Sequence, residues 1–153
     1  MADGTTEPSA AGETEALDAA LAAEHAAVWG YGVVGTTLPE QGRPLATAAE
    51  NAHRDARDRL VALLSEQGAD PVGPEGAYEV PFPVLSEADA AALAVTLEDG
   101  VAAAWVRVLA AAAGPGTREL AVGALGSTEL RAVDWRARAG TSPVTTPFPG
   151  LPA

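Results

Sequence analysis

The spacing of its helix breaks constrains the fold of this 153-residue chain more than any other feature. Four alanine-rich segments repeat apolar residues every three to four positions, which is typical of amphipathic helices. We expect these helices at residues 13–38, 44–68, 86–113 and 117–139. Only a few residues separate the first helix from the second, and the third from the fourth. Such short connections make the two helices of each pair antiparallel.

The connection between the second and third helices is much longer. Residues 69–85 contain four prolines and two glycines, so they cannot continue either helix. They are also long enough to run from one end of a bundle to the other, and the second and third helices can therefore run parallel. A single long crossover of this kind is typical of ferritin-like folds. We expect an all-α, ferritin-like four-helix bundle with a long crossover loop.

The two ends of the chain differ in composition from the bundle, which we place at residues 13–140. Residues 1–12 are small and polar, and we expect them to be disordered. Residues 141–153 contain four prolines, and we expect an extended tail packed on the bundle. The crossover and the tail share a Pro-Phe-Pro motif. We therefore expect both Phe82 and Phe148 to lie on the bundle surface.

Each of the four helices carries one glutamate within its apolar face. These glutamates are Glu24, Glu50, Glu98 and Glu129. His53 follows Glu50 by three residues and forms an E-x-x-H pair with it. One carboxylate per helix together with E-x-x-H pairs is how ferritin-like bundles build a two-metal site. The fourth helix has Ala132 where the second histidine would stand, so this centre is incomplete.

Two interpretations of these residues remain open. In the first, iron or manganese is bound by a set of five residues, namely Glu24, Glu50, His53, Glu98 and Glu129. In the second, a hydrogen-bonded Glu24–His53–Glu98 cluster satisfies the buried polar groups without metal. Arg57 or Arg136 would then serve as a further partner. The sequence therefore assigns no cofactor, and iron and manganese are the candidates.

Six stretches of the sequence carry a family resemblance. They are AALAAEHAAVWGYGVVG (residues 19–35), AHR (52–54), YEVPFPV (78–84), LED (97–99), DWR (134–136) and PFPGLP (147–152). Together they resemble an actinobacterial ferritin-like family of unknown function, domain of unknown function 4439, over nearly the whole chain from residue 15. The resemblance implies a four-helix ferritin-like fold and no established reaction. Set against the di-iron ferritin pattern, the four glutamates and His53 match and Ala132 does not.

Composition argues against several classes of partner and site. The net charge is −12, and no basic patch is available to neutralise phosphates. We therefore expect neither nucleic acid nor an anionic membrane as a partner. The chain has no cysteine, which excludes disulfides, thiolate nucleophiles and cysteine metal sites. Its N-terminal residues lack the basic start and apolar run of a signal peptide, and we expect a cytoplasmic protein.

His25 and Trp29 share a helix face that lies off the main apolar stripe. With Gly32 they would form either a close-packed homodimer patch or a surface that packs beneath the crossover loop. We expect a homodimer, and the sequence indicates no other protein partner.

The sequence gives little support for catalysis. Glu24 and His25 are adjacent on a helix, so they do not face each other and cannot act as an acid–base pair. We expect a non-catalytic structural or interaction protein with a buried Glu/His cluster. The alternative is an iron- or manganese-binding protein with oxidase or iron-handling activity.

Overall fold

The computed structural model of the chain describes residues 9–152 and shows four long helices. They are α1 (Ala10–Thr37), α2 (Arg43–Glu66), α3 (Glu87–Ala111) and α4 (Pro115–Arg138). No strand occurs among these residues. The predicted all-α four-helix bundle is confirmed. Within residues 9–152 none of the helices is both long and apolar enough to cross a membrane.

The helix ends follow local chemistry. The hydroxyl of Ser86 accepts a hydrogen bond from the amide of Asp89 and caps α3, as Ser9 caps α1 through Gly12. Gly68 lies beyond the end of α2 with a φ of 75°, a conformation that glycine adopts without steric cost. Because α1 begins at Ala10, residues 10–12 are helical and not disordered as expected. The rest of that prediction, residues 1–8, lies outside the described part of the chain.

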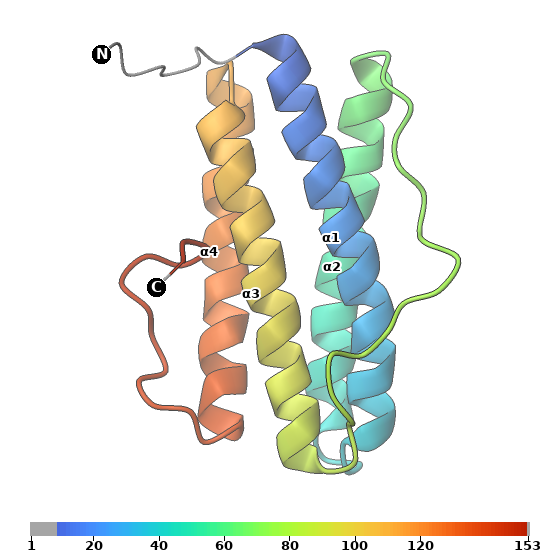
Figure 1. Cartoon of the computed structure of the whole chain (residues 1–153), viewed down its shortest axis with the longest axis vertical. Coiled ribbons are helices and arrows are strands. Elements are labelled where there is room, and N and C mark those ends of the chain that lie inside the picture. The colour runs from blue at the N-terminus through green and yellow to red at the C-terminus, as the bar shows by residue number, and fades with distance from the viewer. Residues whose placement is uncertain (1–8, 153) are drawn as a thin grey trace.

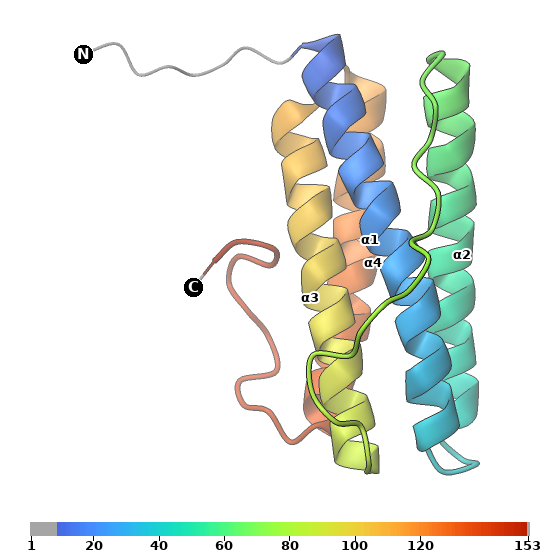
Figure 2. The same cartoon turned by 45° about the vertical axis from the view of Figure 1, so that its right-hand side comes forward.

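The connectivity is the one expected for a ferritin-like bundle. Helices α1 and α2 run antiparallel, as do α3 and α4 (Figures 1 and 2). The loop between Glu66 and Glu87 returns along the whole length of the bundle, so α2 and α3 run parallel. The predicted long crossover is confirmed.

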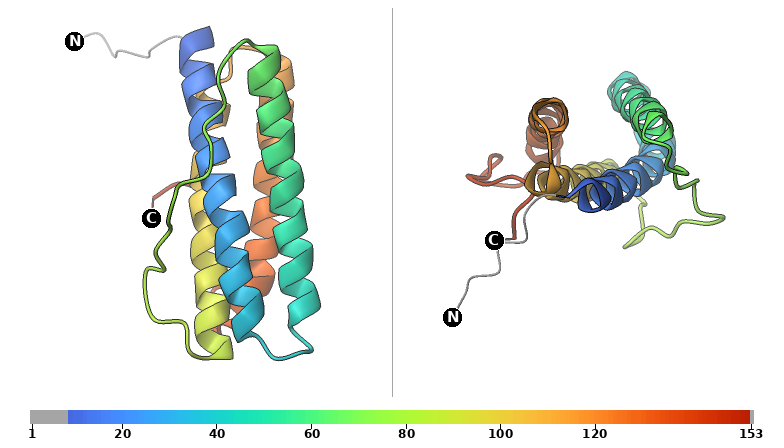
Figure 3. Two further views of the ribbon diagram at one scale, coloured as in Figure 1. Left: turned by 90° about the vertical axis from the view of Figure 1, so that its right-hand side faces the viewer. Right: turned by 90° about the horizontal axis from the view of Figure 1, so that it is seen from above.

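The bundle is open along one edge. Helix α1 packs on α2 and on α3, and α3 packs on α4, whereas α2 and α4 have at most marginal contact. Viewed from above, the four helices form an open arc with α2 and α4 at its two ends (Figure 3). The faces that α2 and α4 turn toward each other are therefore not closed by helix packing.

Two apolar clusters fill the interior. One contains Leu17, Leu21, Leu60, Leu64, Trp105 and Val108. The other contains Tyr31, Val34, Ala46, Leu93, Ala94 and Trp135. On α1, the buried Glu24 lies between Leu21 of the first cluster and Tyr31 of the second. The buried polar groups therefore lie between the two apolar clusters of the bundle.

The crossover packs on the bundle. The rings of Trp29 and Tyr78 lie 5.5 Å apart, and His25 Nε2 lies 3.1 Å from the carbonyl oxygen of Val72. Of the two environments considered for His25 and Trp29, the structure shows packing beneath the crossover. Phe82 packs against the second apolar cluster, as expected. Phe148 differs from its expected position, because 70% of its surface is exposed.

Helix α4 presents a different face to the core than its large apolar residues predict. By helical spacing, Val122, Leu125 and Val133 share one face with Glu129. The buried residues of α4 are instead Ala121, Thr128, Ala132, Trp135 and Arg136. Small residues and one tryptophan form the inner face because α4 packs closely on α3, and Val122 is left 57% exposed.

Candidate functional site

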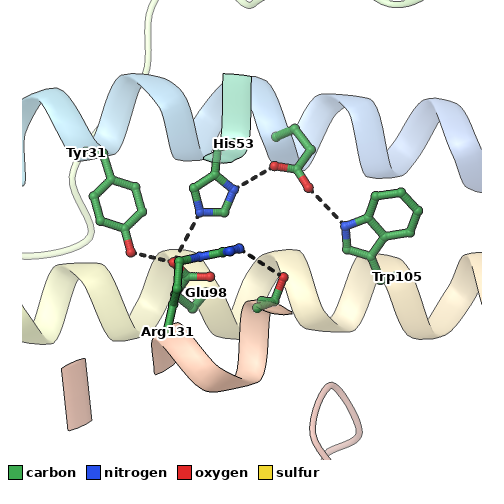
Figure 4. Close-up of polar contacts among 7 residues, drawn as sticks. Tyr31, His53, Glu98, Trp105 and Arg131 are labelled. Atoms are coloured by element: carbon green, nitrogen blue, oxygen red, sulfur yellow. Dashed lines mark hydrogen bonds and ion pairs between the residues drawn. The ribbon is translucent and has the colours of Figure 1, made fainter. Parts of the chain in front are cut away.

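His53 of α2 is fully buried between two carboxylates (Figure 4). Its Nδ1 lies 2.6 Å from Oε2 of Glu24 on α1, and its Nε2 lies 3.1 Å from Oε1 of Glu98 on α3. Glu24 and Glu98 are both buried as well. The structure thus brings together three of the five predicted site residues, one from each of three helices.

Four further side chains complete this cluster. The indole Nε1 of Trp105 donates to Glu24 Oε1 at 2.9 Å. The Tyr31 hydroxyl donates to Glu98 Oε1 at 2.5 Å, and the Tyr31 ring stacks on His53. Arg131 Nε donates to the same Glu98 oxygen at 2.9 Å, and its Nη2 donates to the Thr128 hydroxyl at 3.3 Å. We call these seven residues the central network: Glu24, Tyr31, His53, Glu98, Trp105, Thr128 and Arg131.

Opposite charges compensate each other around Glu98 in the central network. Burial alone would lower the pKa of His53, but its hydrogen bonds to Glu24 and Glu98 outweigh burial and raise it. Burial alone would raise the pKa of Glu98, but His53 and Arg131 outweigh burial and lower it. The Glu98 carboxylate therefore lies between the His53 ring and the Arg131 guanidinium, two groups of opposite charge. Burial and the charge of Glu98 raise the pKa of Tyr31 far above its ordinary value, so its hydroxyl stays protonated as a donor.

Glu50 and Glu129 lie outside the central network. Glu50 pairs with Arg54 along the outer side of α2. Glu129 accepts a hydrogen bond from Arg136 Nη1 at 2.8 Å, and the same guanidinium binds Asp99 at 2.7 Å. The structure therefore differs from the expected inward orientation of these two glutamates. The geometric reason is that each lies to one side of its buried helix face.

The arginines that we expected to neutralise the buried acids have other partners. Arg57 pairs with Asp58 on the surface, and Arg136 holds Glu129, Asp99 and the carbonyl oxygen of Val144. Arg131 takes the expected role at Glu98 instead.

The donor set does not fit a two-metal centre in this arrangement. Each ring nitrogen of His53 contacts a different carboxylate, on opposite sides of the ring, so both are used within the protein. The Arg131 guanidinium already pairs with Glu98. In a two-metal centre this carboxylate would instead be needed to offset the positive charge of the metal ions. No group of three or more histidine, cysteine, aspartate or glutamate side chains within residues 9–152 is arranged to hold a metal ion. Oε2 of Glu98 is nevertheless buried without a hydrogen-bond partner among these residues.

A groove of about 650 Å³ runs between α2 and α4 and reaches the central network. Glu24 and Trp105 line its floor, and Thr128 and Arg131 lie along its α4 side. Small residues form part of its walls, and the charged side chains of Asp55, Arg59 and Glu119 form another part. The open edge of the bundle therefore gives a bound molecule access to an otherwise buried polar cluster.

Comparison with known proteins places the chain in a family. A family model described as "Domain of unknown function (DUF4439)" matches residues 16–153. The chain belongs to this family. The predicted family resemblance is thus confirmed.

One solved structure extends the likeness of this DUF4439 chain to the fold. A conserved hypothetical protein from Mycobacterium tuberculosis, solved by crystallography, is 35% identical, with a TM-score of 0.82. The likeness covers 84% of this chain and 98% of that chain. No curated protein matches the DUF4439 chain.

Sequence reasoning missed four members of the central network in this DUF4439 chain. Tyr31 and Trp105 share the inner faces of their helices with Glu24 and Glu98, each seven residues after the glutamate of its own helix, so their positions were visible in the sequence but their hydrogen bonds were not. The α-helical spacing of Thr128, Ala132 and Trp135 would have shown the true inner face of α4. Arg131 gave no comparable signal, because its long side chain reaches the network from the edge of that face.

Proposed function

We propose that this protein is a non-catalytic structural and interaction protein in which the central network takes the place of a metal centre. The observation that supports this proposal is His53, whose two ring nitrogens bind Glu24 and Glu98 while Arg131 binds Glu98. Imidazolium and guanidinium then supply the positive charge that metal ions would supply in a di-metal bundle. The network joins α1, α2, α3 and α4 and holds the bundle in one arrangement.

The hydrogen bonds of the network also argue against acid–base catalysis. A general base needs an available lone pair within hydrogen-bond reach of the substrate proton that it removes. His53 has no available ring nitrogen, and it does not line the groove. We therefore propose binding without chemistry as the role of the groove between α2 and α4. We further propose that the protein is a cytoplasmic homodimer.

A metal-binding protein is the second candidate function. The observation that favours it is Glu98 Oε2, which is buried without a partner among the described residues. In this alternative, iron or manganese is bound by the predicted set of Glu24, Glu50, His53, Glu98 and Glu129, and the protein has an oxidase or iron-handling activity. Glu50 would have to leave Arg54, Glu129 would have to leave Arg136, and Arg131 would have to leave Glu98.

Thermal unfolding with and without metal separates the two candidates. The protein would be purified without a tag or chelator and melted anaerobically with Fe(II) or Mn(II), beside the His53→Ala variant. We expect no metal-dependent rise in melting temperature. A ligand present at 100 times its dissociation constant would stabilise the folded state by about 2.7 kcal/mol, which such a melt resolves. A rise seen in the wild type and lost in His53→Ala would contradict the proposal and support the metal centre.

An equal rise in both proteins would place the metal elsewhere on this acidic surface. Elemental analysis of the same samples supplies an independent readout. One or two ions retained per chain, and lost in the variant, would also contradict a metal-independent network.

A further inference from the structure

Helices α2 and α4 face each other along the open edge of the bundle without packing together (Figure 3). The groove that reaches the central network lies near the middle of this edge. A second cavity of about 420 Å³ lies toward one end of the two helices, and a third of about 120 Å³ lies toward the other. On α2 the residues that line these cavities recur every three or four positions from residue 45 to residue 66, so they share one helix face. We call this open edge, with the facing sides of α2 and α4, the seam.

The residues on the two sides of the seam match in size. Leu63 of α2 and Leu120 of α4 line one cavity and pack at the edge of the first apolar cluster. Leu45 and Trp135 line the cavity at the other end, beside the second apolar cluster. Between these ends many of the facing residues are small, namely Ala52, Ala56, Gly123, Ala124 and Ser127. Small side chains let helix axes approach to about 8 Å, so α2 and α4 can pack together and extend both apolar clusters.

Opposite charges also face each other across the seam. Arg59 of α2 and Glu119 of α4 line the groove, and both are exposed. Leu63 faces Leu120, and the same antiparallel register places Arg59 within one turn of Glu119. Neither has an ion-pair partner among residues 9–152. The approach of α2 to α4 would bring these two charges together.

We propose that the bundle exchanges between this open arrangement and a closed one, in which α2 packs on α4 and Arg59 pairs with Glu119. Helices α1 and α3 pack on each other and form the fixed part, while α2 and α4 move at the two ends of the arc. Closure covers Glu24 and Trp105 on the floor of the groove and removes the space for a bound molecule. A molecule in the groove therefore selects the open arrangement. As regulation of binding, closure rests on the proposed role of the groove, whereas the motion itself does not.

Opposing contributions explain why we infer exchange and not permanent closure. Closure gains apolar contact at both ends of the seam. It also removes water from Asp55 and Arg59 in the groove and from Asp134 beside Leu45. Arg138 lies four residues after Asp134 on α4, at the spacing that allows the two to pair. The open arrangement keeps these charges in water.

Distances between spin labels test closure. The chain has no cysteine, so labels attach only at introduced cysteines. Asn51→Cys and Leu130→Cys place labels on exposed residues at one level of the seam, and Glu15→Cys with Arg107→Cys is the control pair on α1 and α3. Dilution into unlabelled protein restricts the measurement to distances within one chain. We expect two distances across the seam and one in the control. A single distance across the seam, long or short, would overturn the proposal.

Charge reversal tests the ion pair in the same labelled protein. Arg59→Glu or Glu119→Arg places like charges across the seam, and we expect the population at the short distance to fall about three- to fivefold relative to the long one. The Arg59→Glu/Glu119→Arg double variant should recover the wild-type ratio. Glu79→Arg makes the same change of charge on the crossover and should leave the ratio unchanged. Single variants that keep the wild-type ratio would rule out the Arg59–Glu119 contact and the closed arrangement built on it.

A disulfide across the groove gives an independent test. Ala56→Cys/Ala124→Cys places thiols at facing small residues, and a bond requires Cα atoms within about 7 Å. Ala52→Cys/Gly116→Cys is the control, because these positions are roughly twelve residues out of register, or about 18 Å apart along the seam. We expect mass spectrometry to find an intrachain disulfide in the first variant alone after mild oxidation. No bond in the first variant, or equal bonding in both, would overturn closure and leave the binding role of an open groove standing.

Discussion

Glu98 is the residue on which most of the central network depends. One of its oxygens accepts hydrogen bonds from Tyr31, His53 and Arg131, and the side chain is fully buried. Glu98→Ala would leave an imidazolium and a guanidinium without their shared anion. We expect a loss of about 3–5 kcal/mol in the free energy of unfolding, because an uncompensated buried charge is costly. Chemical denaturation would measure this loss.

Glu50→Ala is the matched control for that substitution. Glu50 pairs only with Arg54, whose side chain is half exposed, so its removal should cost less than about 1 kcal/mol. Equal losses in the two variants would show that Glu98 has no special role in the network.

His53 should make the stability of the protein depend on pH. Its folded pKa is raised above the ordinary value of 6.5, so the protonated imidazole favours the folded state. This stabilisation is complete below about pH 6.5 and is lost as the pH rises through the raised folded pKa. Melting temperatures of the wild type and of His53→Gln should therefore converge on the alkaline side. Parallel curves from pH 6 upward would mean that His53 does not titrate in the folded protein.

Glu98 acts at the opposite end of the pH range. Its folded pKa is lowered from 4.5, so its contribution is present above that pH and is lost as the pH falls through the lowered value. The network should therefore be most stabilising between these two limits, where Glu98 and His53 are both charged.

At the scale of the helix, two glycines of α1 provide a matched pair. A Cβ at Gly30 would lie 2.6 Å from the Leu97 side chain of α3, whereas a Cβ at Gly32 would meet nothing within 4 Å among the described residues. We expect Gly30→Ala to destabilise the protein by about 1 kcal/mol through overpacking. Gly32→Ala should stabilise it by about 0.5–1 kcal/mol, since alanine favours helix. Thermal melts of both variants would check the prediction, and two changes of the same sign would contradict the α1–α3 contact.

The helices themselves were predictable, and the reason is local. Pro44 and Ser86 mark helix starts, Gly68 and Gly140 mark helix ends, and apolar spacing gave the inner faces of α1, α2 and α3. On α4 the spacing of the large apolar residues indicates the wrong inner face, because the true inner face consists mainly of small residues and Trp135 while larger apolar residues lie outside. Burial there is decided by how closely α4 approaches α3, which no local pattern reports.

The candidate site was predictable to the extent that it depends on helix faces. Glu24, His53 and Glu98 met because three correctly oriented faces meet in the bundle. Glu50 and Glu129 did not join them, because a residue at the edge of a face reaches a neighbouring arginine before it reaches the core. The sequence did not show that Arg131, and not Arg57 or Arg136, binds Glu98. Arginine side chains are long and flexible, so their positions in the sequence do not determine which group the guanidinium reaches.

At the scale of the whole molecule, the open edge makes the four helices unequal. Helices α1 and α3 each pack on two neighbours, whereas α2 and α4 each pack on one. The central network offsets part of this difference, because His53 ties α2 to both α1 and α3, and Arg131 ties α4 to α3. Stability should therefore be lowest along the groove, at the two ends of the arc, away from the network.

Amide hydrogen exchange would show this inequality directly. We expect the slowest exchange in α1 and α3, and faster exchange in α2 and α4, because backbone amides of a helix packed on one side open at lower free energy. The comparison is made at high dilution, where copies of the chain are separate. Protection of α2 equal to that of α1 would mean that the edge between α2 and α4 is closed in solution.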